Sequence, residues 1–351
     1  MPLIDIRTLS KEELKNAFTT TGEKPFRGAQ VYEWLWKKSC ISFDEMSNLS
    51  KANRDWLKAT YVINAIAVEE KQISSDRTIK STFKLFDGEQ VEGVLIPTDK
   101  RMTACVSSQV GCSLTCTFCA TGKMERKRNL NPDEIYDEVV LIREQATKHY
   151  ERPLTNIVFM GMGEPLLNYN NVLLAIEKIC GEEGLHISPD RITVSTAGIA
   201  KMIKKLGDDE VKFNLALSLH AANDVKRNRI MPINESNNLE TLTEALQYFY
   251  NKTRNRITFE YIAFRDFNDS MDDAKELLAF CKKVPSKVNI IEYNPIDADE
   301  FQKAETDKIN RFCAYLERNG VITKVRRSRG KDIDAACGQL ANKKHPEAQM
   351  N

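Results

Sequence analysis

The chain has 351 residues, 42% of them hydrophobic, and a formal net charge of +1 at pH 7. This length allows one large α/β domain with a small domain appended to it, and the near-zero charge provides no overall field that would attract nucleic acid. No run of about 18 apolar residues is present, which excludes a transmembrane helix, and residues 1–15 are too charged for a signal peptide. These features predict a cytoplasmic protein.

Residues 1–60 predict a small helical module. The segment 9–20, LSKEELKNAFTT, begins with a Ser10 N-cap and has apolar residues at helical spacing. Two more helical patterns follow at 28–38 and 42–61. The basic residues of this module are Lys24, Arg27, Lys37 and Lys38. They fit an RNA-docking module, and a plain helical cap is the alternative.

Residues 61–98 change to an alternating pattern that is typical of strands. Short strands are expected within 62–74, 79–86 and 90–97, with the sequence DGEQ at 87–90 as a hairpin turn. We expect this region to be a β extension that links the helical module to the main domain.

From residue 99 to residue 341, strands alternate with helices. The expected strands are 157–161, 191–198, 213–220, 257–264, 287–295 and 322–328, and the expected helices are 171–183, 239–252, 272–284 and 307–320. Repeated β–α units indicate a parallel sheet covered by helices, and about six units are fewer than the eight of a closed barrel. The predicted fold is therefore α/β, a partial (βα)6 barrel. Residues 342–351 are expected to form a loose polar tail.

Three cysteines with the spacing C-x3-C-x2-C form the most informative motif: Cys112, Cys116 and Cys119. Three thiolates on a short loop can each bind one iron of a [4Fe–4S] cluster and leave the fourth iron open. Electron-carrier clusters use four cysteines, so an open iron indicates that a substrate or cofactor coordinates there. A structural zinc site normally has four Cys or His ligands and fits less well, and inert buried thiols are the remaining alternative.

Polar residues follow several of the predicted strands, where the active sites of parallel α/β folds lie. Gly161, Gly163 and Glu164 follow the first strand; glycine allows close approach of the backbone to a ligand, and the carboxylate suits the amino group of an amino acid. The ends of later strands carry Ser195, Ser218, Leu219, His220 and Asn294. Their polar side chains suit a ribose or a carboxylate. A strand-ending turn at 161–164 and a core role for His220 are the alternatives.

Local basic clusters are present although the net charge is near zero. They lie at 123–128, 226–229, 252–256 and 324–331, and the last contains Lys324, Arg326, Arg327, Arg329 and Lys331. Phosphate binding needs such local positive density, although any one cluster also fits a solvated surface. We expect the clusters at 123–128 and 324–331 to line an entry for RNA.

The strongest indication of function is a resemblance carried by nine segments: 24–36, 105–122, 128–135, 159–168, 194–198, 218–224, 229–234, 293–295 and 329–340. Together they resemble the bacterial radical S-adenosylmethionine (SAM) methyltransferases that modify C2 of adenosine in 23S ribosomal RNA and in transfer RNA. The resemblance implies a [4Fe–4S] cluster and SAM as cofactors. It also implies reductants of the flavodoxin or ferredoxin type and of the thioredoxin type as partners. A monomer is the default expectation.

The same resemblance assigns roles to three residues outside the cluster motif. It implies that Cys337 first receives a methyl group, that a radical formed on this group adds to C2, and that Cys105 then releases the product by forming a disulfide with Cys337. It places removal of the C2 proton on Glu92, whose apolar neighbours on the predicted strand would raise its pKa. Without the resemblance, Glu92 fits an outward-facing strand residue and both cysteines fit buried apolar positions.

Two other functions remain as alternatives. The related enzymes that methylate C8 of adenosine in 23S ribosomal RNA share Cys105, the cysteine loop and Cys337. The Gly-Glu-Pro sequence at 163–165 and the N-terminal segment fit the C2 group better. A non-catalytic iron–sulfur protein that binds RNA is the second alternative, and it would not need Glu164 or the polar residues at the strand ends.

Overall fold

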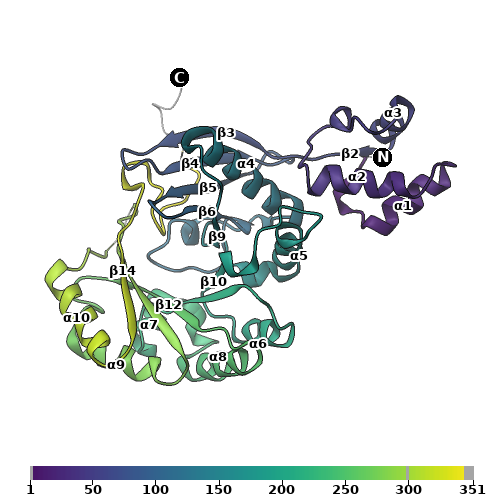
Figure 1. The fold of residues 1–351 in the computed structure, drawn as a ribbon. Coiled ribbons are helices and arrows are strands. Elements are labelled where there is room, and N and C mark those ends of the chain that lie inside the picture. Colours follow the sequence, from purple (N-terminus) through teal and green to yellow (C-terminus); the bar gives the residue numbers. More distant parts are fainter. Residues whose placement is uncertain (1–2, 298–299, 344–351) are drawn as a thin grey trace.

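The N-terminal part of the chain is a helical module that stands to one side of the main domain (Figure 1). The computed structural model describes residues 3–297 and 300–343. The module consists of α1 (Lys11–Thr20), α2 (Phe26–Trp36) and α3 (Lys51–Thr60), and the short strands β1 (Ile4–Asp5) and β2 (Tyr61–Val62) pair where it begins and ends. Ser10 caps α1 as predicted, since its hydroxyl accepts the Glu13 N–H and the Glu13 carboxylate accepts the Ser10 N–H.

A ten-stranded sheet forms the main domain, in the order β14-β13-β12-β11-β10-β9-β6-β5-β4-β3. The strands from β6 to β14 in this order run parallel: β6 (Met102–Val106), β9 (Asn156–Phe159), β10 (Ile192–Thr196), β11 (Asn214–Ser218), β12 (Ile257–Ala263), β13 (Ser286–Glu292) and β14 (Ile322–Arg326). The helices that connect them are α4 (Pro132–Tyr150), α5 (Tyr169–Cys180), α6 (Ala200–Asp208), α7 (Asp224–Ile230), α8 (Leu239–Thr253), α9 (Met271–Cys281) and α10 (Thr306–Arg318). Within the described ranges this is the predicted partial barrel of six βα units, followed by one more strand.

The predicted β extension is continuous with the main sheet. β5 (Gln90–Pro97), β4 (Ile79–Lys84) and β3 (Ala67–Ile73) continue it from β6 as antiparallel strands, and Cys105 on β6 is paired with Val94 on β5 and Val158 on β9. The strands β7 (Gln109–Val110) and β8 (Arg128–Asn129) pair at the two ends of the loop that carries the three cysteines. The sheet does not close, because β14 and β3 are its two edges.

A segment after β14, residues 327–343, crosses the opening of the barrel and is named the C-terminal strap. Figure 1 shows it in yellow, running from β14 toward β4 and β5. Arg329 donates to the carbonyl of Pro97 at the end of β5 (2.8 Å), and Asp332 accepts from Ser74 (2.5 Å) beside β3. The strap therefore joins the two edges of the open sheet. The remaining residues of the predicted polar tail, 344–351, lie outside the described residues.

Four elements of five or more residues are absent from the predicted set, β6, α4, α6 and α7, as are the two-residue strands β1, β7 and β8. β6 and α7 are short, and α6 is only slightly longer. In α4 the face toward the protein contains the carboxyl groups of Asp133, Glu134, Asp137 and Glu138, all of them buried. Because buried acids interrupt the apolar periodicity on which helix prediction depends, α4 does not look amphipathic in the sequence. No helix in the described ranges is long and apolar enough to cross a membrane.

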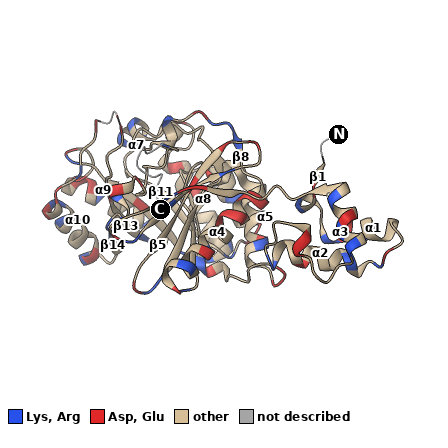
Figure 2. Cartoon of the chain, turned by 90° about the horizontal axis from the view of Figure 1, so that it is seen from above, with Lys and Arg blue, Asp and Glu red and all other residues tan. Residues whose placement is uncertain are grey.

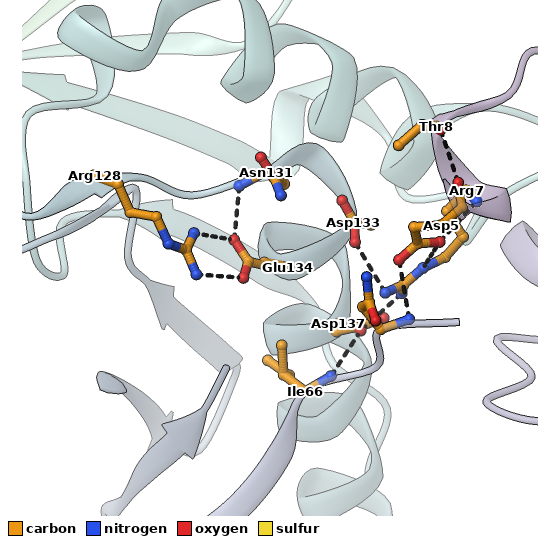
Figure 3. A network of polar contacts seen from close by, with 10 residues as sticks. Asp5, Arg7, Thr8, Ile66, Arg128, Asn131, Asp133, Glu134 and Asp137 are labelled. Carbon is orange, nitrogen blue, oxygen red and sulfur yellow. Dashed lines mark hydrogen bonds and ion pairs between the residues drawn. The ribbon is translucent and has the colours of Figure 1, made fainter. Parts of the chain in front are cut away.

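Buried ion pairs attach the helical module to α4 (Figure 3). Arg7, in the 3-10 turn after β1, lies 2.9 Å from a carboxylate oxygen of Asp133 and 2.8 Å from one of Asp137. Near the same helix end, Glu134 binds Arg128 through both carboxylate oxygens (2.7 and 2.8 Å). Acids in the first turn also interact favourably with the helix dipole. The start of α4 is therefore where the module, the cysteine loop and the main domain are held together.

Replacing Arg7 with Met should destabilise the protein by about 3–5 kcal/mol, because the carboxylates of Asp133 and Asp137 would lose their buried cation. The midpoint of urea-induced unfolding of the cofactor-free protein measures this effect. The matched control is Lys58→Met, which removes an exposed ion pair with Asp44 and should leave the midpoint unchanged. Equal midpoints for the two variants would contradict the role given to Arg7.

Candidate active site

Two adjoining pockets lie at the carboxyl ends of the parallel strands. The cysteine pocket is lined by residues that include Cys112, Cys116, Cys119, Gly163, Glu164, Ser195, Ser218, His220 and Glu260. The basic pocket is lined by residues that include Cys105, Arg326, Arg327 and Arg329. Cys337 lines both pockets, as do Cys119 and Met160. A reactive thiol at Cys337 would therefore face a ligand in either pocket.

The three cysteines of the C-x3-C-x2-C motif all bring their side chains to the cysteine pocket. Burial raises the pKa of Cys112 to about 11 and also raises the pKa values of Cys116 and Cys119. Metal binding displaces thiol protons and so offsets this cost. No three Cys, His, Asp or Glu side chains within the described ranges converge on a single metal ion. A cubane cluster does not require this, since each thiolate binds a different iron.

Glu164 presents a buried carboxylate to the same pocket. One oxygen accepts the N–H of Ala197 (2.7 Å) and the other accepts the N–H of Leu166 (3.0 Å), while burial raises the pKa of the group. Gly161 and Gly163 line the pocket as well, but packing explains why they are glycines. A Cβ at Gly161 would lie 2.7 Å from the Ser107 hydroxyl, and one at Gly163 would lie 2.5 Å from the Cβ of Gln109.

Ser195, Ser218 and His220 line the cysteine pocket from adjacent strand ends, as the sequence predicts. The two serine hydroxyls lie 3.4 Å apart. His220 accepts the N–H of Ile262 at Nδ1 (3.0 Å), and burial together with the charge of Arg227 lowers its pKa to about 3. The ring is therefore neutral at physiological pH and carries its proton on Nε2.

Leu219 and Asn294, two of the predicted cofactor-binding residues, are not among the described residues that line either pocket. The side chain of Leu219 is fully buried in the hydrophobic core, and its N–H donates to the Glu260 carbonyl (3.0 Å). Asn294 is buried and donates to the carbonyl of Cys337 (3.3 Å). Asn294 thus holds the strap in the position that brings Cys337 to the pockets.

The strap is also bound directly to the cysteine loop. The Ala120 N–H donates to the Gly338 carbonyl (2.7 Å), and the Thr121 hydroxyl donates to the Leu340 carbonyl (2.6 Å). Solvent reaches Cys337, yet the surrounding protein raises the pKa of its thiol. Burial raises the pKa of Cys105, and the negative charge of a Cys337 thiolate raises it further, to a smaller extent. The structure therefore brings the two predicted thiols to one pocket.

Glu260 is a pocket residue that the predicted set does not contain. It lies on β12, is buried, lines the cysteine pocket and forms an ion pair with Arg326 (3.4 Å). The positive charge of Arg326 partly offsets the effect of burial, which raises the pKa values of both Cys105 and Cys337. A single carboxylate in the otherwise apolar sequence ITFEYIAF was the signal that could have identified Glu260.

Glu92 is buried on β5 but is not among the described residues that line either pocket. Its carboxylate lies 3.3 Å from the Lys80 ammonium and accepts the N–H groups of Ala341 (2.8 Å) and Asn342 (3.2 Å). The carboxylate thus has a cation beside it, in addition to the apolar neighbours that the sequence predicts. It holds the end of the strap that carries Cys337.

The basic clusters have different environments, although Figure 2 shows Lys and Arg mixed with Asp and Glu over much of the chain. The cluster at 324–331 contributes Arg326, Arg327 and Arg329 to the basic pocket. In the cluster at 123–128, Lys127 and Arg128 form ion pairs with acids, and none of its described residues lines either pocket. In the cluster at 226–229, Arg227 is not on the surface but fully buried.

Two family models match the chain. The ribosomal RNA large subunit methyltransferase N-terminal domain matches residues 4–63, and the radical SAM superfamily matches residues 106–280.

Whole-chain comparisons extend this similarity. A protein of Cytophaga hutchinsonii named "Probable dual-specificity RNA methyltransferase RlmN" is 64% identical, with 96% of this chain and 93% of that protein covered. A protein of the same name from Christiangramia forsetii is 61% identical, with 97% and 96% covered. Among solved structures, a radical SAM methyltransferase from Sphaerobacter thermophilus has a TM-score of 0.90 and 36% identity, with 96% of this chain and 99% of that chain covered.

His220 should remain neutral from pH 8 to pH 5, whereas an ordinary histidine titrates near about 6.5. The nitrogen chemical shifts of cofactor-free protein labelled with 15N-histidine report this directly, and they should show a proton on Nε2 throughout. Because the chain has four histidines, loss of one signal in His220→Gln assigns the resonance. A transition of that signal above pH 5 would show that the burial and the Ile262 hydrogen bond do not act as described.

Proposed function

The chain belongs to the RlmN family of dual-specificity RNA methyltransferases within the radical SAM superfamily, and on that premise we propose that it methylates C2 of adenosine in 23S ribosomal RNA and in transfer RNA. The observation that carries the proposal is the position of Cys337, whose thiol lines both the cysteine pocket and the basic pocket. A methyl group carried on this sulfur would lie between a cofactor in one pocket and an RNA base in the other.

The cysteine pocket fits the cofactors of the superfamily, a [4Fe–4S] cluster and SAM. We assign the cluster to Cys112, Cys116 and Cys119, and when bound it supplies the electron that cleaves SAM to a 5′-deoxyadenosyl radical. We assign SAM to the predicted strand-end residues that line this pocket: Gly163, Glu164, Ser195, Ser218 and His220. Leu219 and Asn294 would act on this site only indirectly, Leu219 through core packing and Asn294 through the strap. Glu164 suits the amino group, since it is a buried carboxylate with backbone donors already holding it in place.

We assign to the two thiols the roles that the family resemblance implies, and their shared pocket supports this. Cys337 needs to lose its proton before it can accept a methyl group, because the thiolate is the nucleophile. Arg326 opposes the effect of burial on the pKa values of Cys337 and Cys105, so it favours both thiolates. After the methylene carbon has bonded to C2, the adduct would lose one electron, which the oxidised cluster would accept, and the C2 proton. Attack of the Cys105 thiolate on the Cys337 sulfur then breaks the carbon–sulfur bond and forms a disulfide, and the electron pair of the broken bond stays on the methylene carbon, which takes up a proton to become the methyl group.

We assign removal of the C2 proton to Glu92, as the family resemblance implies. Its carboxylate is bound to Ala341 and Asn342, close in sequence to Cys337, so movement of the strap would change its surroundings. The Lys80 ammonium lies 3.3 Å from the other carboxylate oxygen of Glu92. A base at this position must reach the basic pocket after the strap has shifted.

The basic pocket suits an adenine extruded from RNA. Enzymes that act on a base within a nucleic acid take it out of the stack, and Arg326, Arg327 and Arg329 provide local positive charge for the flanking phosphates. We further propose that the helical module at residues 1–60 docks RNA. The match to an RNA methyltransferase N-terminal domain and the exposed side chains of Lys24, Lys37 and Lys38 support this.

The reaction requires reductants of two kinds. A flavodoxin or ferredoxin would supply the electron for the cluster, and a thioredoxin-type protein would reduce the disulfide between Cys105 and Cys337. A catalytic disulfide that must be reduced in each turnover fits a cytoplasmic enzyme. We propose that the enzyme acts as a monomer.

Mass spectrometry of nucleosides tests the proposed reaction. The cluster-loaded enzyme is given unmodified 23S ribosomal RNA and transfer RNA together with SAM that has a trideuterated methyl group. The expected product is 2-methyladenosine that retains two of the three deuterons, because one is removed while the methyl group is on Cys337. Cys337→Ala should yield none. Labelled 8-methyladenosine would identify the C8 reaction, and a product with all three deuterons would rule out the route through Cys337.

Arg327→Ala should weaken RNA binding and reduce the magnitude of the log–log salt slope by about 1, since one phosphate contact is lost. Arg327 is preferred to Arg326 because it is exposed and leaves the Glu260 ion pair intact. Fluorescence anisotropy with labelled RNA at several salt concentrations measures both effects. Lys324→Ala removes an exposed cation from the same basic cluster, outside the basic pocket, and should have the smaller effect. Equal effects would place the RNA elsewhere.

A further inference from the structure

Arg227 is a fully buried cation with an unusual set of partners. It lies on α7, has no exposed surface, and forms no ion pair with a carboxylate in the part of the chain that the structure describes. Its N–H groups donate to neutral oxygens: the carbonyls of Leu219 (3.1 Å), Ala197 (2.6 Å) and Ser218 (3.3 Å), and the side-chain oxygen of Asn234 (2.5 Å). A buried charge without an ion-paired opposite charge lowers the stability of the fold, which indicates that Arg227 has a role other than stabilisation.

The three carbonyls belong to the loops that follow β10 and β11. The peptide groups of Ala197 connect Arg227 to the pocket, because the Ala197 carbonyl accepts from the guanidinium while the Ala197 N–H donates to the Glu164 carboxylate (2.7 Å). Ser218 lines the pocket with its side chain and accepts from Arg227 with its carbonyl. The guanidinium therefore clamps two neighbouring loops that line the cysteine pocket.

The helix that carries Arg227 is in direct contact with the cysteine loop. The Thr117 N–H, next to Cys116, donates to the carbonyl of Ile230 at the end of α7 (3.1 Å). Two acidic groups act on the charge of Arg227 without forming an ion pair with it, Cys116 as its thiolate and the Asp224 carboxylate. Burial lowers the pKa of Arg227 to about 10, which still leaves it charged at neutral pH.

We propose that Arg227 is a positioning residue whose charge balances that of the iron–sulfur cluster and whose donors fix the two loops that face SAM. The proposal rests on the cluster assigned to the cysteine pocket above. A cluster bound by three thiolates becomes more negative by one unit when it takes up an electron, and a cation in a low-dielectric interior favours that change. Arg227 should therefore raise the reduction potential of the cluster.

The motif RIMPIN at residues 229–234 gains a role from this assignment. Asn234 is buried and holds the guanidinium with its side-chain oxygen, while its amide donates to Asp224 (2.8 Å) and Asn228 (2.6 Å). This network fixes the orientation of Arg227 without placing a carboxylate on it. Asp224 is bonded to Asn234 and acts on the charge of Arg227 without a direct ion pair.

A redox titration monitored by electron paramagnetic resonance tests the proposal on the cluster-loaded full-length enzyme without RNA. Arg227→Gln removes the charge, and Arg227→Lys keeps it but cannot bridge three carbonyls. In the Gln variant the equilibrium constant for one-electron reduction should fall by about tenfold or more, a midpoint at least about 59 mV more negative. In the Lys variant it should stay within about threefold of the wild type. SAM affinity, measured by calorimetry, should fall in both variants.

The matched control is Arg229→Gln on the same helix, where an exposed arginine pairs with Glu300 (3.5 Å); it should change neither quantity. An unchanged midpoint in Arg227→Gln, or the same midpoint in Gln and Lys variants, would overturn the charge role. So would failure of both variants to bind a cluster while Arg229→Gln binds one, since Lys keeps the charge. Failure of the wild type to bind a cluster or to form 5′-deoxyadenosine would instead contradict the proposed function.

Discussion

The C-terminal strap is the constraint on which the site depends, because it crosses an opening that the sheet leaves. A closed barrel would have no free edges, whereas here β14 and β3 are separate edges. The strap is fixed to the extension through Asp332 and to the cysteine loop through Gly338 and Leu340. Cys337 lies between these attachments in the sequence. Because the strap crosses the opening of the sheet, it places this thiol at the boundary between the cysteine pocket and the basic pocket.

The hydrogen bonds that hold the last part of the strap are of two kinds. Near the cysteine loop they join backbone groups and Thr121, which have no charge to gain or lose. Near its end, the strap is held by the Glu92 carboxylate, which also faces Lys80. The two attachments therefore differ in kind, because one depends on a buried carboxylate and the other on neutral groups of the cysteine loop.

Local patterns predicted the fold well, and long-range charge pairing explains what they missed. The strand ends, the cysteine loop and the Ser10 cap follow from neighbouring residues, so the sequence shows them directly. α4 was hidden because its buried acids pair with residues far along the chain, as Asp137 does with Arg7. Asn294 and Leu219 end or follow predicted strands, but only the packed structure shows that the Leu219 side chain enters the core and that Asn294 contacts the strap.

The arginines show most clearly what sequence cannot distinguish, because all of them look alike in a basic cluster. Arg7 and Arg128 have carboxylates inside the fold, so their charge is already balanced and they serve to hold elements together. Arg327 lines the basic pocket and is exposed, so its charge is available to a phosphate. Arg227 has neither solvent nor an ion-paired carboxylate among the described residues. Its guanidinium instead donates to neutral oxygens of the loops that line the cysteine pocket, so the sequence alone could not separate this arginine from one on the surface.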